Sequence, residues 1–158
     1  MKALFAIALA LTAAPLLADA QTDALTHPIG QFIDGFNKGD TRSAYAAYAP
    51  GNVSITDEFA PHIWTGPKAP QAWAAQYDVH AKATGVTDGV VTWSAPTRVE
   101  VERAVAYVIV PTLYTYKEKG QPTREEGQMT FVLVRIGKAW KIRGWTWSGV
   151  PPHPAGKG

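Results

Sequence analysis

The amino-acid sequence predicts an α+β fold in which three N-terminal helices pack on one face of a curved antiparallel sheet. Two observations support this prediction. Apolar residues recur at helical spacing only before Gly85. After Gly85, alternating or continuous β-rich runs follow one another and are separated by short turns. Consecutive strands of this kind pair antiparallel, which leaves the helices to cover one face of the sheet.

The first 20 residues are expected to be a secretory signal peptide. Met1 and Lys2 supply a positive end, an Ala/Leu-rich run covers 3–18, and Ala-Asp-Ala at 18–20 is a small-x-small cleavage site. The run is shorter than the roughly 20 apolar residues that a membrane span needs. We therefore expect a periplasmic or secreted protein, without a membrane anchor after cleavage.

The chain after the signal is predicted to form one domain over 21–150, followed by a flexible tail over 151–158. The domain is long enough to bury a core, and three prolines and two glycines make the tail irregular. The net charge of +2 is spread without runs, which argues against nucleic-acid binding. The chain has no cysteine, which excludes disulfides, thiol chemistry and thiolate metal sites.

Two helices are expected before the first strand. One covers 26–38, where Thr26 can cap the start, Gly39 is typical of a C-terminal stop, and four apolar residues share a face: Ile29, Phe32, Ile33 and Phe36. Asp40 is the expected N-cap of a short second helix that Pro50 ends.

A third helix is predicted over 69–84, after short strands at 53–57 and 62–64. Its inward stripe is aromatic and polar, and Gly85 ends it; the stripe comprises Trp73, Tyr77, His80, Ala81 and Thr84. The remaining chain is read as sheet, with strands over 90–102, 104–119, 128–136 and 140–148, a turn at 119–121 and a hairpin through 137–138.

The last strand leaves two interpretations of its tryptophans open. Strict alternation from Trp140 and Ile142 would place Trp145 and Trp147 on the opposite face, as an outer stripe suited to a dimer surface. A bulge at Gly144 would instead return both tryptophans to the apolar face. Glycine inside a strand often marks a bulge, so the second interpretation is favoured.

Asp57 follows a strand whose alternation directs it inward. Val53 and Ile55 alternate with Ser54 and Thr56, and period 2 places Asp57 on the face of the two aliphatic residues. Asp57 could bond a backbone amide near solvent, or it could be a general base with a raised pKa. His80 is either a satisfied histidine of the core or rim, or the acid partner of Asp57.

The layout resembles the nuclear transport factor 2-like superfamily, with its SnoaL-like and ketosteroid-isomerase-like branch the nearest match. The resemblance covers essentially the whole chain after the signal. It rests on I-G-Q-F-I-D-G-F-N-K-G-D at 29–40, a helix with Tyr45 and Tyr48, the strand ending in Asp57, Thr65-Gly66, G-K-A-W-K-I at 137–142 and Trp147-Ser148. It implies a cone-shaped domain around an apolar pocket, on a fold that carries isomerases, cyclases, dehydratases and non-catalytic proteins.

The resemblance places Asp57 where ketosteroid isomerases carry their proton-shuttling base. Their two oxyanion donors, a tyrosine and a protonated aspartic acid, match Phe32 and Met129, neither of which can donate a hydrogen bond. Gln128 or Thr130 would replace Met129 as the match to the protonated aspartic acid if the alignment shifts by one residue. Losing one such donor costs about 3 kcal/mol of transition-state stabilisation, so a steroid-type isomerase is not expected.

Two functions therefore stay open. The favoured one is a binding protein for a small hydrophobic or aromatic molecule, with a pocket of Phe32, Trp64, Trp73, Tyr77, Met129, Trp145 and Trp147. The alternative is an acid–base isomerase, cyclase or dehydratase with Asp57 and His80 as catalytic residues. No cofactor or metal is expected, because the four histidines lack ligand spacing. The resemblance implies a homodimer formed through the sheet.

Overall fold

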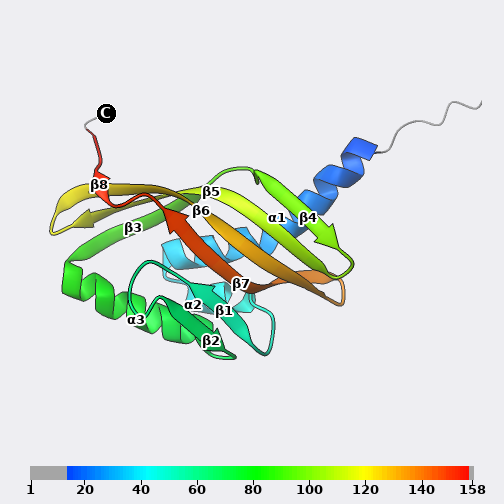
Figure 1. Ribbon diagram of the computed structural model, residues 1–158, viewed down its shortest axis with the longest axis horizontal. Helices are drawn as coiled ribbons and strands as arrows, with labels where there is room; N and C mark the ends of the chain where they lie inside the picture. The colour runs from blue at the N-terminus through cyan, green and yellow to red at the C-terminus, as the bar shows by residue number, and fades with distance from the viewer. Residues whose placement is uncertain (1–13, 157–158) are drawn as a thin grey trace, which may run out of the picture.

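The computed structural model describes residues 14–156. In this part of the chain, the helices α1 (Ala14–Lys38), α2 (Thr41–Ala46) and α3 (Ala69–Thr84) pack with an 8-stranded sheet (Figure 1). Its strands are β1 (Val53–Thr56), β2 (Ile63–Gly66), β3 (Val86–Trp93), β4 (Arg98–Glu102), β5 (Val105–Glu118), β6 (Gln121–Ile136), β7 (Ala139–Gly149) and β8 (His153–Pro154). The predicted α+β class is confirmed.

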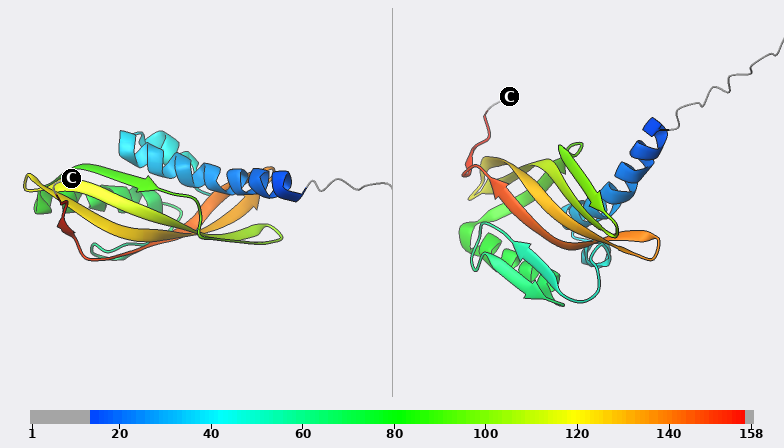
Figure 2. Two further views of the ribbon diagram at one scale, coloured as in Figure 1. Left: turned by 90° about the horizontal axis from the view of Figure 1, so that it is seen from above. Right: turned by 45° about the vertical axis from the view of Figure 1, so that its right-hand side comes forward.

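The sheet has the order β2-β1-β7-β6-β5-β3, with β4 also pairing β5 and β8 pairing β6. Figure 2 shows α1 and α2 against one face of this curved sheet. The prediction of a purely antiparallel sheet is wrong at one pair, because β1 runs parallel to β7 with Ser54 opposite Gly144. No turn joins these two strands, which are far apart in the chain, so a hairpin does not fix their relative direction.

Several strand boundaries differ from those predicted. The run 90–102 is split into β3 and β4, which pair with separate stretches of β5 on either side of a bend at 94–97. β6 begins at Gln121 instead of 128, because its polar first half is the hairpin partner of β5. The tail contains a short pairing, with Pro154 opposite Thr123.

The first helix begins earlier than the expected 26. Thr26 lies inside α1, where its hydroxyl donates to the Thr22 carbonyl at 3.0 Å, and Pro28 is tolerated in the helix interior. The expected signal segment lies mostly outside the described residues, and its cleavage stays a prediction. Among the described residues, no helix combines the length and apolar character needed to span a membrane.

Two local signals at helix ends, Asp40 and Gly85, are confirmed. Asp40 caps α2, since its Oδ1 accepts from the Ser43 amide at 3.1 Å. Gly85 ends α3 with φ of 76°, in the left-handed region that favours glycine. Because Gly85 ends α3 and β3 starts at once, α3 and the sheet are held close together.

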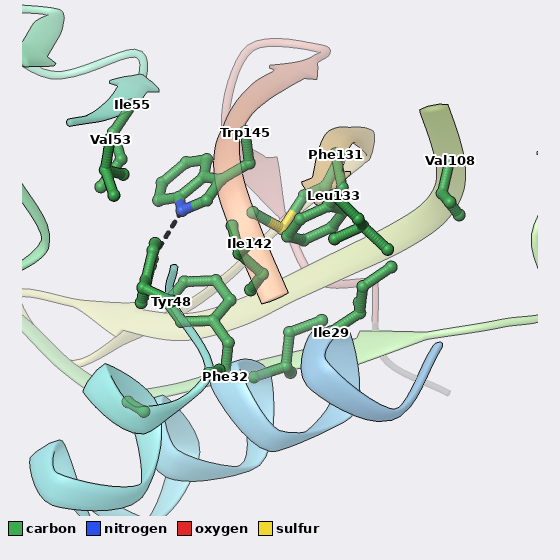
Figure 3. Close-up of a cluster of buried hydrophobic side chains, with 14 of the residues drawn as sticks. Ile29, Phe32, Tyr48, Val53, Ile55, Val108, Phe131, Leu133, Ile142 and Trp145 are labelled. Carbon is green, nitrogen blue, oxygen red and sulfur yellow. Dashed lines mark hydrogen bonds between the residues drawn. The ribbon is translucent and has the colours of Figure 1, made fainter. Parts of the chain in front are cut away.

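The core lies between α1 and the inner face of the sheet (Figure 3). Ile29 of α1, Phe131 of β6 and Ile142 of β7 are fully buried. Trp145 packs beside them and donates from its indole to the Tyr48 hydroxyl at 2.7 Å. This packing fixes α1 and β7, which carry side chains of the pocket described below.

The predicted bulge at Gly144 is present. Val132 pairs with Gly144 while Leu133 pairs with Ile142, so Arg143 is the extra residue in β7. Trp145 is consequently 4% exposed, and Trp147 packs against the core. Gly144 is also needed for space, since a Cβ there would lie 2.5 Å from the Ser54 carbonyl oxygen.

Candidate active site

A cavity of about 90 Å³ lies between α1, α3 and the inner face of the sheet. Its walls include all but one of the predicted site residues, namely Phe32, Asp57, Trp73, Tyr77, His80, Met129, Trp145 and Trp147. The volume corresponds to about six to nine water-sized groups. The cavity therefore suits a small molecule.

Trp64 is the predicted ligand-binding residue that does not line this cavity. Its indole donates to Gln76 Oε1 at 2.8 Å, and its ring centroid lies 5.0 Å from that of Phe59. Phe59 lines the cavity, so Trp64 supports the wall from behind. The sequence could not show this, because Phe59 lies in a loop between Trp64 and the strand that ends before Asp57.

Asp57 faces the cavity and is held by two donors. Its Oδ2 accepts from the Trp73 indole at 2.7 Å, and its Oδ1 accepts from the Glu58 amide at 2.8 Å. Burial raises the pKa of Asp57 above its ordinary value, and these two hydrogen bonds oppose the rise. The carboxylate is thus fixed in direction and made more basic, as a general base requires.

Glu58 stands at the rim of the cavity, where part of its side chain is exposed while its carboxyl group lies close to Glu125. Its Oε2 accepts from the Trp147 indole at 3.2 Å. Burial, followed by the neighbouring Glu125 carboxylate, raises the pKa of Glu58 to about 8. Trp147 can reach this position because Gly127 has no side chain. A Cβ at Gly127 would lie 2.8 Å from the Trp147 ring.

The inner face of β5 and β6 changes from apolar to polar along the pair. Val110 opposite Met129 belongs to the apolar end, whereas Tyr114 lies opposite Glu125 at the polar end. Glu125 is 2% exposed, and its Oε1 accepts from the Tyr116 hydroxyl at 2.6 Å. Sequence reasoning missed Glu125, because two consecutive glutamates before the predicted strand at 128–136 are typical of a solvated turn.

Two tyrosines supply hydroxyl donors that the sequence did not reveal as a pair. The Tyr77 hydroxyl of α3 bonds the Tyr114 hydroxyl of β5. Burial raises the pKa of both phenols, so both stay protonated at neutral pH. In this pair one hydroxyl donates a hydrogen bond to the other. The accepting hydroxyl keeps its own proton, which it can donate to a further acceptor. Gly89 leaves the space, since a Cβ there would lie 2.7 Å from the Tyr114 oxygen.

His80 lies in the same cavity as Asp57, as the helical stripe predicted. Its ring stacks on Phe59 with centroids 5.1 Å apart, and it makes no side-chain hydrogen bond within the described part of the chain. Its charge, when protonated, would lower the pKa of Asp57. His80 is therefore placed to interact with a ligand, while its catalytic role stays a prediction.

Phe32 and Met129 both line the cavity and offer no donor. Phe32 makes edge contacts with Tyr48, Trp73 and Phe131 at centroid distances of 5.6, 6.0 and 6.4 Å. Among the described residues, no group of three or more His, Asp or Glu side chains is arranged to hold a metal ion.

Solved structures similar to this chain share its fold at low sequence identity. A hexachlorocyclohexane dehydrochlorinase, LinA type 2, is 14% identical with a TM-score of 0.73 over 90% of this chain and 94% of that chain. A ketosteroid isomerase-like protein from Erwinia carotovora is 18% identical with a TM-score of 0.64 over 84% and 98%. A nuclear transport factor 2-like superfamily protein from Salmonella enterica is 16% identical with a TM-score of 0.68 over 89% and 96%. No family model and no curated protein sequence matches the chain.

The protein has a nuclear transport factor 2-like fold. The predicted resemblance is thereby confirmed for the fold. Identities this low carry no activity from one chain to another. The chemistry of this nuclear transport factor 2-like pocket is therefore argued from its own residues.

The pocket combines an acceptor and a donor. Asp57 can take a proton, and the Tyr77–Tyr114 pair can donate a hydrogen bond to a developing oxyanion. The hydroxyl pair comes from α3 and β5, whereas Asp57 follows β1. An acceptor and a donor from separate elements in one small, mostly apolar cavity are the parts needed for proton transfer at carbon.

Proposed function

We propose that the protein is a cofactor-independent acid–base enzyme that transfers a proton on a small, mostly apolar carbonyl compound. Asp57 abstracts the proton next to the carbonyl, and the hydroxyl of Tyr77 or Tyr114 donates to the oxyanion that forms. The observation that carries this proposal is the presence of both groups in one cavity of about 90 Å³. The Tyr77–Tyr114 hydroxyl pair supplies the hydrogen-bond donor that the side chains of Phe32 and Met129 lack.

The direction of the Asp57 carboxylate supports a catalytic role over a structural one. A structural strand-end aspartate would be satisfied by backbone amides in water. Asp57 instead receives one backbone amide and the indole of Trp73, a buried side chain of the pocket wall. The raised pKa of Asp57, caused first by burial, brings its basicity closer to neutral pH.

The test is hydrogen–deuterium exchange at carbon. Small cyclic ketones are incubated in D₂O with wild type, and proton loss next to the carbonyl is followed by NMR. Asp57→Asn should slow exchange by about 10²–10⁴-fold, the usual contribution of a general base. Tyr114→Phe should also slow it.

Asp34→Asn is the matched control for the change of carboxylate to amide. Asp34 is an exposed residue of α1 that pairs with Lys38 at 3.4 Å. Exchange by Asp34→Asn should equal that of wild type. Equal exchange by wild type and Asp57→Asn would refute the role of Asp57.

Ligand binding without turnover is the second candidate. The apolar side chains of Phe32 and Met129 favour it, because they fill the positions that the ketosteroid isomerase resemblance assigns to oxyanion donors. A thermal-shift screen of steroid, polyketide and aromatic compounds tests this reading. Equal stabilisation of wild type and Asp57→Asn, with no exchange by either, would support it.

Export and dimerisation belong to the same proposal. The N-terminal segment over 1–20 has the pattern of a signal peptide, so mass spectrometry of the exported chain should give an N-terminus at Gln21. Exposed Val105, Val132 and Ile136 on the sheet favour a homodimer. Sedimentation equilibrium at micromolar concentration tests that state.

A further inference from the structure

Glu125 presents a carboxylate oxygen that lacks a partner inside the pocket. The side chain is 2% exposed, Oε1 accepts from Tyr116, and Oε2 has no hydrogen-bond partner among the described residues. Leaving an acceptor unpaired in a buried site is costly, and more so when the group is charged. That oxygen can be met by the carboxyl of a protonated Glu58, whose pKa is raised by burial and by Glu125, or by a donor that a ligand brings.

Among the described residues, the pocket walls hold three acids, Asp57, Glu58 and Glu125, and no lysine or arginine. The nearest arginine in sequence, Arg124, alternates to the other face of β6, where it pairs with Glu126. His80 is the single lining residue there that could become cationic in the physiological pH range.

Aromatic rings surround the same acids. Tyr114 and Tyr116 stack with centroids 4.7 Å apart beside Glu125, and the Trp147 indole bonds Glu58. Ring faces of tyrosine and tryptophan attract cations within about 6 Å of the centroid. Acids without a cation, enclosed by such rings, are suited to an organic cation rather than to a neutral or anionic molecule.

We propose that the pocket takes a small molecule carrying a protonated amine, whose ammonium group donates to Oε2 of Glu125 and lies among the aromatic rings. This inference rests on the proposed function, since it names the class of compound on which Asp57 would act. The ammonium supplies a donor to Oε2, and the apolar remainder faces Phe32, Met129 and Trp145. A cavity of about 90 Å³ limits the ligand to roughly one ring.

The experiment compares ligands of one shape and different charge on the wild-type protein. Benzylamine, benzyl alcohol and benzyltrimethylammonium are titrated at pH 7 by calorimetry. Benzylamine should bind about tenfold to a hundredfold more tightly than benzyl alcohol, the usual effect of a hydrogen bond to a charged group. Benzyltrimethylammonium should bind more weakly than benzylamine, because it carries charge without an N–H donor.

The indole N–H signals locate the binding. Signals of Trp73 and Trp147 should shift with benzylamine, whereas that of Trp64, which lies behind the wall, should not. Glu125→Gln should remove the preference for the amine, and Glu102→Gln on exposed β4 should keep it. The ligand comparison needs no variant, so it stays decisive if Glu125→Gln fails to fold.

Equal affinity for benzylamine and benzyl alcohol would overturn the amine inference, as would binding of neither. Both results leave the proposed function open, because deuterium exchange on ketones tests Asp57 independently. Loss of exchange activity in Asp57→Asn together with equal affinities would refute the amine class alone. A wild type that does not exchange the ketones and still prefers benzylamine would support the amine site and favour binding without turnover.

Discussion

Replacing Gly144 by alanine tests how the bulge positions the pocket. A Cβ at this position would lie 2.5 Å from the Ser54 carbonyl oxygen and 3.5 Å from Ser54 Cβ. The first contact is with backbone, so no side-chain rotation can relieve it. Strand β1 or β7 has to move by several tenths of an ångström at the parallel pair of Ser54 and Gly144.

The expected cost follows from overpacking in a close-packed region. Insertion of one methyl group into such a site costs about 1–3 kcal/mol. Urea denaturation followed by far-UV circular dichroism should show this loss in the free energy of unfolding. Because β1 ends directly before Asp57, the shift should also weaken ligand binding in the pocket.

Gly156→Ala is the control, since a Cβ there meets no atom within 4 Å. It should leave the free energy of unfolding within about 0.5 kcal/mol of wild type, as surface substitutions usually do. A Gly144→Ala protein as stable as Gly156→Ala would show that the two strands do not approach as described. The bulge would then not explain the position of Asp57.

Three further changes test other parts of the structure. Asp40→Ala should cost about 1 kcal/mol in urea denaturation, because it removes the side-chain cap of α2. Phe131→Ala should cost about 3–5 kcal/mol, because that side chain is fully buried. Glu58→Gln should flatten the pH dependence of stability. A raised folded-state pKa means that Glu58 stabilises the fold below its ordinary pKa of 4.5, and that this contribution is lost as pH rises through about 8.

Each of these changes has a matched control or a contradicting result. Asp34→Ala removes another exposed aspartate, which lies within α1 and is not a helix cap. It should lower the free energy of unfolding less than Asp40→Ala does. Val132→Ala, 38% exposed beside Phe131, should cost far less than the buried change. A wild type whose stability relative to Glu58→Gln stays constant from pH 4.5 to 8 would contradict the raised pKa of Glu58.

Local signals in the sequence predicted much of the fold. Asp40 and Gly85 mark helix boundaries through a side-chain cap and a left-handed backbone, both of which depend on a few neighbouring residues. Period 2 directed Asp57 inward, and the glycine within an alternating strand indicated the bulge at Gly144. These predictions succeeded because each rests on an interaction within one element or on a fixed periodicity.

The polar end of the pocket could not be predicted in the same way. Glu125 lies in a run of charged residues that resembles a solvated turn, and only the long pairing with β5 places it opposite Tyr114. Tyr77 and Tyr114 are 37 positions apart and come from different elements. Trp64 has the composition of a pocket residue, yet Phe59 stands between it and the cavity.

The sequence by itself determined the class of fold, the N-cap of α2, the end of α3, the bulge in the last strand and the inward direction of Asp57. Only the tertiary structure decided the parallel pairing of β1 with β7, the hydroxyl pair of Tyr77 and Tyr114, and the unpaired oxygen of Glu125. Periodicity fixes which face of an element a side chain occupies. Which side chains then meet across a cavity depends on the register and packing of elements that are distant in the chain.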